Sequence, residues 1–234
     1  MGKPMKKLFV VSDIHGYYTL LKNALDQAGF DKDNDDHLLV CCGDYFDRGS
    51  ENMEVLKFFE RLRHKVLLRG NHEDMLLKLL LTGKLQRHHY INGTMSTLQN
   101  MLGKYSIDPI DDSIDFSGKT RIVDRFCEFI QETVDYYETE HYVFVHGWLP
   151  ENAQTPEARQ NAGSEAWAKA RWVKWVEQYT DQRPLADKTL VCGHVPTFFR
   201  TPGCTDIYFG NGLIAIDAGT ADTQQVNVLV LENP

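Results

Sequence analysis

The sequence has 234 residues, of which 42% are hydrophobic and 25% charged, and its formal net charge is −8. This length and composition suit one large hydrophobic core, and no linker or internal repeat interrupts the chain, so we expect a single domain over residues 1–234. The negative charge argues against a nucleic-acid-binding or membrane-binding protein, and no apolar stretch reaches the ~18 residues of a membrane span.

Short runs of apolar and β-branched residues predict buried strands at five places, residues 8–11, 38–42, 66–68, 142–145 and 190–192. Between them, apolar residues recur at helical spacing in 20–28, 55–62 and 75–80. This alternation indicates an α/β fold. Two further runs, 213–217 and 226–231, predict two closing strands.

Residues of metal-liganding types lie at or beside the carboxyl ends of the five predicted strands, nearly all with a glycine alongside. They are, in chain order, Asp13, His15, Asp44, Asn71, His146 and His194. Sheets of α/β proteins gather ligands at the carboxyl ends of their strands, and glycine lets the backbone turn sharply close to an ion. We therefore predict a binuclear metal centre in which Asp44, central in the series, bridges the two ions.

The donor types narrow the choice of metal. Mixed Asp, Asn and His donors without thiolate suit Mn²⁺, iron or Zn²⁺, whereas Mg²⁺ and Ca²⁺ prefer oxygen alone and structural zinc prefers cysteine. Two ions about 3.5–4 Å apart would share a water, lower its pKa and clamp a phosphoryl group for in-line displacement.

Five motifs carry a family resemblance. They are Ser12-Asp13-Ile14-His15-Gly16, Gly43-Asp44-Tyr45-Phe46-Asp47-Arg48-Gly49, Gly70-Asn71-His72-Glu73, His146-Gly147 and Gly193-His194. In this order the sequence resembles the calcineurin-like metallophosphoesterases, and within them the bacterial and bacteriophage lambda-type members of the phosphoprotein phosphatase family. Ser12 stands where the family usually has glycine, and this small-for-small change should leave the metal site intact.

The resemblance implies a fold and a cofactor. The expected fold is a four-layer α/β/β/α sandwich with the metal site at the carboxyl ends of strands, and the two closing strands are expected in its second sheet. The expected cofactor is a pair of divalent ions, manganese first, with iron or zinc as alternatives.

The resemblance also implies a role for each motif residue. One ion would be held by Asp13, His15 and Asp44, and the other by Asp44, Asn71, His146 and His194.

The remaining motif residues would act on the phosphate ester. His72 would be the general acid, oriented and kept cationic by Asp47, while Arg48 and Asn71 would contact phosphate. The residue types agree with these roles, because a carboxylate partner raises the pKa of a histidine and a guanidinium matches phosphate with two hydrogen bonds.

Residues 83–140 and 150–185 are longer than ordinary connections and carry helical patterns, so we expect them to roof the site and select the substrate. In lambda-type relatives a tryptophan-centred helix supplies a second phosphate-binding arginine. Arg171, one turn after Trp167, is the candidate; Lys169 is an alternative, and an ordinary solvated helical charge is a third reading.

The implied function is a metal-dependent phosphomonoesterase, a serine/threonine phosphatase acting on a phosphoprotein or phosphopeptide. The alternative enzyme is a symmetrical dinucleoside polyphosphate hydrolase, of diadenosine tetraphosphate, and a non-catalytic scaffold is a third hypothesis. The scaffold is disfavoured because every expected ligand and the acid His72 are present.

Five cysteines, an odd number without C-x-x-C spacing, point to a reducing compartment. Cys41, Cys42 and Cys192 fall inside predicted strands, which indicates core packing and a cytoplasmic enzyme.

Overall fold

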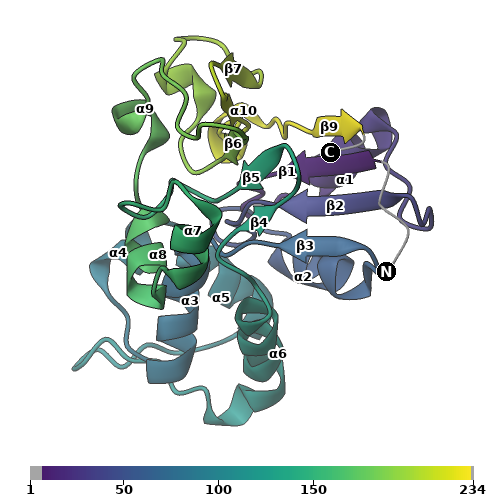
Figure 1. Cartoon of the computed structure of the whole chain (residues 1–234). Coiled ribbons are helices and arrows are strands. Elements are labelled where there is room, and N and C mark those ends of the chain that lie inside the picture. Colours follow the sequence, from purple (N-terminus) through teal and green to yellow (C-terminus); the bar gives the residue numbers. More distant parts are fainter. Residues whose placement is uncertain (1–6, 233–234) are drawn as a thin grey trace.

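The computed structural model describes residues 7–232, and Figure 1 shows two β-sheets with helices on their outer sides. The first sheet has the order β3-β2-β1-β9. Its strands are β1 (Lys7–Val11), β2 (His37–Cys41), β3 (Lys65–Leu67) and β9 (Leu229–Glu232). The first three are parallel, and β9 runs antiparallel to β1 at the edge.

The second sheet has the order β4-β5-β6-β8-β7. Its strands are β4 (Tyr137–Glu138), β5 (Tyr142–Phe144), β6 (Thr189–Cys192), β7 (Tyr208–Gly210) and β8 (Leu213–Ala215). The three central strands β5, β6 and β8 are parallel, while β4 and β7 pair antiparallel at the two edges. All five strands predicted ahead of the metal-liganding residues are therefore present.

One prediction about the closing strands was wrong. The first of them, β8, lies in the second sheet as expected, but the last, β9, pairs with β1 in the first sheet. Its residues alternate between buried and exposed, as suits an edge strand with one covered face. That alternation sets which face of β9 is buried, but it carries no information about which sheet it joins.

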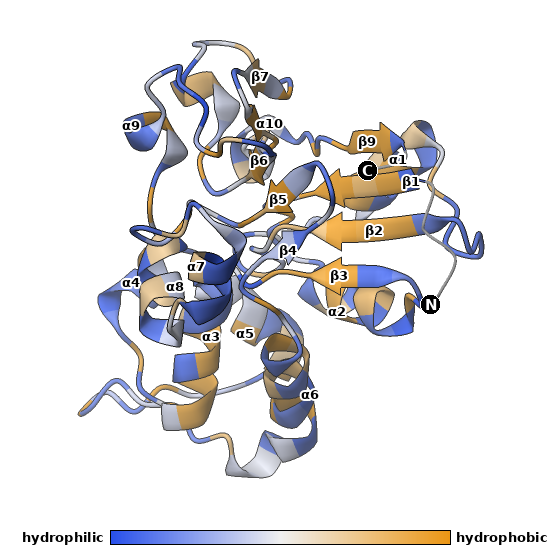
Figure 2. Cartoon of the chain, viewed as in Figure 1, coloured by the Kyte–Doolittle hydropathy of each residue, from blue (hydrophilic) through white to orange (hydrophobic). Residues whose placement is uncertain are grey.

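Side chains from the facing sides of the two sheets form a central core. It includes Leu8, Val10, Val40, Cys42, Phe144, Val191, Ile214, Leu229 and Leu231. Alternate residues of β1 and β2, such as Phe9 and Leu39, face the opposite way and pack on helices of the outer layer. These strands are accordingly hydrophobic along most of their length in Figure 2.

Helices complete the outer layers. The first sheet is covered by α1 (Tyr18–Ala28), α2 (Asn52–Arg61), α3 (Asn71–Thr82), α5 (Thr94–Leu102) and α6 (Thr120–Gln131). The second is covered by α8 (Ser164–Ala170) and α9 (Trp175–Gln178). Shorter helices are α4 (Arg87–Ile91), α7 (Pro156–Asn161) and α10 (Thr220–Thr223), with 3₁₀ turns at Ser117–Lys119 and Thr197–Phe199. The four-layer α/β/β/α prediction is confirmed.

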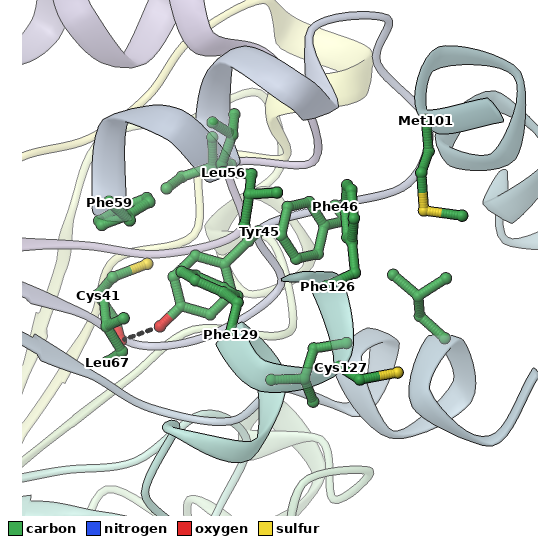
Figure 3. Packing of buried hydrophobic residues seen from close by; sticks show 14 of the residues in the cluster. Cys41, Tyr45, Phe46, Leu56, Phe59, Leu67, Met101, Phe126, Cys127 and Phe129 are labelled. Atoms are coloured by element: carbon green, nitrogen blue, oxygen red, sulfur yellow. Dashed lines mark hydrogen bonds between the residues drawn. The ribbon is translucent and has the colours of Figure 1, made fainter. Parts of the chain in front are cut away.

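An aromatic cluster anchors the loop after β2. The ring of Tyr45 packs edge-on between Phe59 and Phe129, with ring centroids 5.2 and 5.1 Å away (Figure 3). Its single hydroxyl hydrogen is shared between the carbonyl oxygen of Leu68, at 2.9 Å, and that of Cys41, at 3.2 Å. Asp44 therefore lies between the end of β2 and Tyr45, whose position is fixed by this packing.

Two predictions from composition can also be placed. Cys41, Cys42 and Cys192 are fully buried, as expected of core cysteines. Across residues 7–232, no helix has both the length and the apolar character needed to cross a membrane.

Candidate metal centre

The parallel strands of both sheets end at polar residues that lie close together. Asp13 follows β1, Asp44 follows β2, Asn71 begins α3 after β3, His146 follows β5 and His194 follows β6. A sixth polar residue, Asp217, follows β8. The carboxyl ends of the parallel strands in the two stacked sheets thus supply one cluster, which is buried except for the half-buried His194.

Asp44 lies between two groups of donors. Its Oδ1 is 3.4 Å from Nε2 of His146, and its Oδ2 is 3.7 Å from Nε2 of His15. Two sets of donor atoms, each within 4.8 Å of one another, share this carboxylate: His15, Asp44 and His72, and Asp44, His146 and His194. A carboxylate with one oxygen toward each set is arranged as a bridging ligand would be.

Backbone carbonyls fix the orientation of two histidines. Nδ1 of His15 lies 3.0 Å from the carbonyl oxygen of Phe46, and Nδ1 of His146 lies 2.7 Å from that of Cys42. Since a carbonyl only accepts, each Nδ1 carries the hydrogen and each Nε2 presents a lone pair to the cluster. Metal-binding histidines are commonly oriented by such an outer hydrogen bond.

The acceptors of the second set face one another. Nε2 of His146 lies 2.8 Å from Oδ1 of Asn71 as well as 3.4 Å from Asp44. An imidazole nitrogen, an amide oxygen and a carboxylate oxygen are three donor types that a divalent cation accepts together. The residues present therefore fit divalent cations.

Burial and neighbouring charges favour the protonation states that a metal requires. Burial, reinforced by His72, holds the pKa of His15 well below its usual range. Burial and the neighbouring His146 lower the pKa of His194 to about 3. Burial alone would raise the pKa of Asp44, but the surrounding histidines outweigh it and the pKa is lowered. Neutral imidazoles around an ionised carboxylate are what metal binding needs.

Asp13 is held differently from the other predicted ligands. Its Oδ2 accepts hydrogen bonds from the Ser12 hydroxyl and from the backbone N–H of His194, at 2.9 Å for the latter. Burial, with a further contribution from Asp44, raises its pKa. The structure places Asp13 in neither three-donor set, and His72 stands beside His15 and Asp44 instead. The ligand role of Asp13 stays a prediction.

His72 forms a buried pair with Asp47. Its Nδ1 lies 2.7 Å from Oδ2 of Asp47, and its Nε2 points to Asp44 at 3.8 Å and to Nη2 of Arg48 at 3.5 Å. Burial lowers the pKa of His72, but Asp44 and Asp47 together raise it to about 9. A proton is thus held at Nε2, beside an arginine that is exposed to solvent.

Backbone strain is concentrated at this site. Ten non-glycine residues of the described chain have positive φ, and six of them are predicted site residues: Asp13, His15, Asp44, Asp47, Arg48 and His194, with φ between 49° and 73°. Such conformations are uncommon and cost about 1–3 kcal/mol each. Because six of these conformations occur together, the surrounding contacts must fix the backbone of the site, and with it the positions of these side chains.

The glycines beside the ligands allow close approach. A Cβ on Gly70 would overlap Oδ1 of Asp44, and a Cβ on Gly193 would overlap the side chains of Ser12 and Asp13. Both glycines are required because the neighbouring loop is too close for any side chain.

Two acidic residues of the site received no role from the sequence. Glu73 is fully buried and accepts hydrogen bonds from the backbone N–H groups of Gly70, Asp44 and Tyr45, at 2.9 to 3.0 Å. It therefore ties the loop after β2 to the loop after β3. Burial and the charge of Asp44 raise its pKa to about 7.

Asp217 is the second such residue. It is 3% exposed and accepts a hydrogen bond from the N–H of Gly219 at 2.7 Å. Burial and the charge of Asp13 raise its pKa well above the usual range. The signal that could have found it is its position at the end of the apolar run 213–216, the same signal that marked His146.

Arg171 has its hydrogen-bond partners outside the cluster. Its Nε donates to Asp74 at 2.7 Å and its Nη1 to Asp135 at 2.6 Å, and the residue is 4% exposed. The alternative, Lys169, is exposed and paired with Glu165. Both of these partners of Arg171 are carboxylates outside the cluster, so its phosphate-binding role stays a prediction.

The chain is similar to known proteins along most of its length. The family model for calcineurin-like phosphoesterases matches residues 6–217. Serine/threonine-protein phosphatase 2 of Salmonella typhimurium strain LT2 is 27% identical over 207 residues, covering 88% of this chain and 88% of that protein. The symmetrical bis(5'-nucleosyl)-tetraphosphatase of Wigglesworthia glossinidia brevipalpis is 34% identical over 80 residues, covering 34% of this chain and 28% of that protein.

The fold is shared with a solved structure as well. A protein serine/threonine phosphatase from Saccharomyces cerevisiae superposes with a TM-score of 0.60 at 15% identity, covering 99% of this chain and 81% of that one. The chain belongs to the calcineurin-like phosphoesterase family and has the metallophosphoesterase fold.

Proposed function

We propose that this phosphoesterase is a serine/threonine protein phosphatase that hydrolyses phosphomonoesters of phosphoproteins or phosphopeptides. The observation that carries the proposal is the extent of the match to the Salmonella serine/threonine-protein phosphatase, which spans 88% of both chains. It includes the long segments between the motifs, where substrate selection is expected. The proposal also infers two divalent ions, manganese first with iron or zinc as alternatives, and a reducing, cytoplasmic compartment.

The two proposed metal sites share Asp44. Asp13 and His15 would complete one, and Asn71, His146 and His194 the other. The positions of His15, Asn71, His146 and His194 support this assignment. Two bound divalent ions would supply Lewis acidity to the phosphoryl oxygens and to the attacking water.

The chain's own residues would handle the leaving group and the phosphate. Nε2 of His72 would carry a proton and lies beside Asp44 and the exposed Arg48, so it would protonate the departing serine or threonine oxygen. Asp47 holds the opposite ring nitrogen, which fixes the direction of Nε2. Arg48, exposed and with its Nη2 3.5 Å from Nε2, would bind phosphate oxygens, and Asn71 would be a second phosphate contact.

A comparison of substrates tests the proposal. One preparation, reconstituted separately with Mn²⁺, Zn²⁺ and Fe²⁺, would be assayed on a phosphoserine peptide and on diadenosine tetraphosphate. We expect the higher kcat/KM on the phosphopeptide, with the greatest activity in Mn²⁺. Preference for diadenosine tetraphosphate with every metal would replace the protein phosphatase proposal by the alternative.

That alternative is a symmetrical dinucleoside polyphosphate hydrolase. It is favoured by the 34% identity to the Wigglesworthia tetraphosphatase, which is higher than that to the Salmonella phosphatase but extends over only 34% of this chain. The metal site would serve either substrate, so the difference must lie in the residues around it.

Arg48→Ala should lower kcat/KM by the equivalent of about 2–4 kcal/mol, because one preorganised donor to the developing phosphate charge is lost. Arg48→Lys should recover only part, since an ammonium lacks the two-pronged hydrogen bonding. Competitive inhibition by inorganic phosphate should weaken in parallel, while Arg61→Ala, an exposed arginine at the end of α2, should change neither quantity. Unchanged turnover and unchanged phosphate inhibition in Arg48→Ala would show that Arg48 does not bind phosphate and has only a structural role in its turn.

Arg171→Ala should lower the free energy of unfolding by about 3 kcal/mol, since it removes the shared partner of Asp74 and Asp135 and leaves Asp74 only a longer contact with Arg69, at 3.7 Å. The value is at the low end for a broken buried ion pair because both carboxylates are partly exposed. Urea unfolding would measure it, with Lys169→Ala, which breaks an exposed pair, as the control. Normal stability combined with weakened phosphate inhibition would instead identify phosphate as the partner of Arg171.

A further inference from the structure

Two threonines of α5 contact the carboxylate that orients His72. The hydroxyl of Thr94 donates to Oδ2 of Asp47 at 2.8 Å, and the hydroxyl of Thr97 donates to Oδ1 at 2.7 Å. Both threonines are fully buried, at 0% exposure. Three residues apart on one helix, they present their hydroxyls on the same face.

Thr97 makes a second contact that fixes the backbone of the same aspartate. Its hydroxyl oxygen accepts a hydrogen bond from the N–H of Asp47 at 2.9 Å while its hydrogen is donated to the carboxylate. Oδ1 of Asn52 accepts from the same N–H at 3.0 Å. Asp47 has a φ of 73°, so these contacts maintain a backbone conformation that it would otherwise seldom adopt.

The start of α5 lies against the turn that carries Asp47. The N–H of Arg48 donates to the carbonyl oxygen of Gly93, and a Cβ on Gly93 would lie 2.7 Å from that nitrogen. Neither threonine hydroxyl caps its own helix. Both hydroxyls donate to the carboxylate of Asp47 instead. The positive N-terminal end of the dipole of α5 also favours the negative charge of that carboxylate.

We propose that Thr94 and Thr97 are positioning residues for the Asp47–His72 pair. Together with His72 they occupy three directions around one carboxylate, so the plane of that carboxylate, and with it the direction in which Nε2 of His72 points, is set by α5. The importance of this for catalysis rests on the proposed phosphatase function. The contacts themselves do not depend on it.

Thr97→Val is the main variant, because valine keeps the shape of threonine and removes both contacts to Asp47. With a phosphoserine peptide, whose leaving group needs protonation, kcat should fall about tenfold or more, part of the 10²–10⁴ that general acid catalysis contributes. With p-nitrophenyl phosphate the loss should be less than about threefold, and KM should be unchanged for both. Thr97→Ser, which keeps the hydroxyl, should recover most of the activity.

A double-mutant cycle separates positioning from general stability. In a His72→Asn background, Thr97→Val should cause no further loss of kcat, because the residue through which it acts is already gone. Thr220→Val is the matched control, since Thr220 is equally buried and its hydroxyl has no hydrogen-bond partner within residues 7–232. Equal losses on both substrates, or a loss that persists in the His72→Asn background, would overturn the proposal.

A measurement without metal or substrate keeps the test independent of the proposed function. In metal-free, ¹⁵N-histidine-labelled protein, Nδ1–H of His72 should give a low-field proton resonance from its bond to Asp47. Thr94→Val and Thr97→Val should shift or broaden it, and Thr220→Val should not; an unmoved resonance in both would refute the positioning role. Thr94→Val removes one contact only, so it serves if Thr97→Val does not fold. If the wild-type protein were inactive on phosphomonoesters, the phosphatase proposal would be refuted, but the NMR result on the His72 resonance would still stand.

Discussion

Asp44→Asn is expected to lower both metal content and turnover. The wild-type protein should hold about two ions per chain, the count for a binuclear centre. Asparagine keeps the size of Asp44 but replaces one carboxylate oxygen by an N–H₂ group, which cannot bind a cation. Since Oδ1 faces His146 and Oδ2 faces His15, either orientation of the amide leaves one donor set incomplete.

The expected effect on activity is large. Changing a residue that only supports a metal ligand typically costs 10–100-fold, so losing the shared ligand should lower kcat by more than about 10²-fold. Metal content would be measured by mass spectrometry after exhaustive dialysis, and turnover on a phosphoserine peptide. Asp26→Asn, at an exposed aspartate of α1 paired with Lys22, is the matched control.

One tightly held ion together with full activity in Asp44→Asn would exclude a bridging role. A second comparison adds detail. Adding excess Mn²⁺ should recover part of the lost activity if the variant only weakens affinity, and the metal concentration for half-maximal rate would then rise. No such recovery is expected from Asp26→Asn, which should start at the wild-type value.

Much of the site could be predicted because strand ends are a local property of the sequence. The apolar runs before Asp13, Asp44 and His146 mark buried strands, and the parallel strands of both sheets bring their carboxyl ends together. The approach of Asp44 to His15 and His146 follows from that topology. The role of the glycines beside the predicted ligands could also be predicted, and the close contacts at Gly70 and Gly193 agree with it.

Other features depend on contacts between distant segments. Thr94 and Thr97 lie about 50 positions from Asp47, and nothing in a polar helix start indicates which loop it will meet. Arg171 follows α8, and its partners Asp74 and Asp135 lie 97 and 36 positions away in the sequence, so no local pattern encodes these contacts. The choice of sheet for β9 is undetermined for the same reason.

The positive φ angles are a third kind of feature. Asp and His adopt the left-handed region more often than most residues but still only in a minority of cases, so their residue types alone do not mark it. Four of the six such residues, Asp13, His15, Asp44 and His194, are predicted ligands, and they lie in strained turns just beyond the strand ends. Strain of this kind is maintained by contacts such as those of Glu73, which joins the two loops that carry Asp44 and Asn71.

His72→Asn is expected to lower kcat on a phosphoserine peptide by about 10²–10⁴ while metal content persists, because the residue would act on the leaving group. With p-nitrophenyl phosphate the loss should shrink, since a good leaving group needs little protonation. Asparagine was chosen because its amide nitrogen can still donate to Asp47, which keeps the buried carboxylate partnered. Metal analysis of the same sample separates loss of acid from loss of an ion.

The pH dependence gives an independent check with a definite sign. Asp44 and Asp47 raise the pKa of His72 to about 9, against the effect of burial, and bound cations near Asp44 would offset part of that increase. The acid works only when protonated, so wild-type kcat on the phosphopeptide should be full below this pKa and fall as the pH rises through it. His72→Asn should lose that alkaline decline. Two results would show that His72 is not the general acid: equal losses on good and poor leaving groups, or an alkaline decline that survives in His72→Asn. Reduced metal content in the variant would instead identify His72 as a metal ligand beside His15 and Asp44, as its place in that donor set allows.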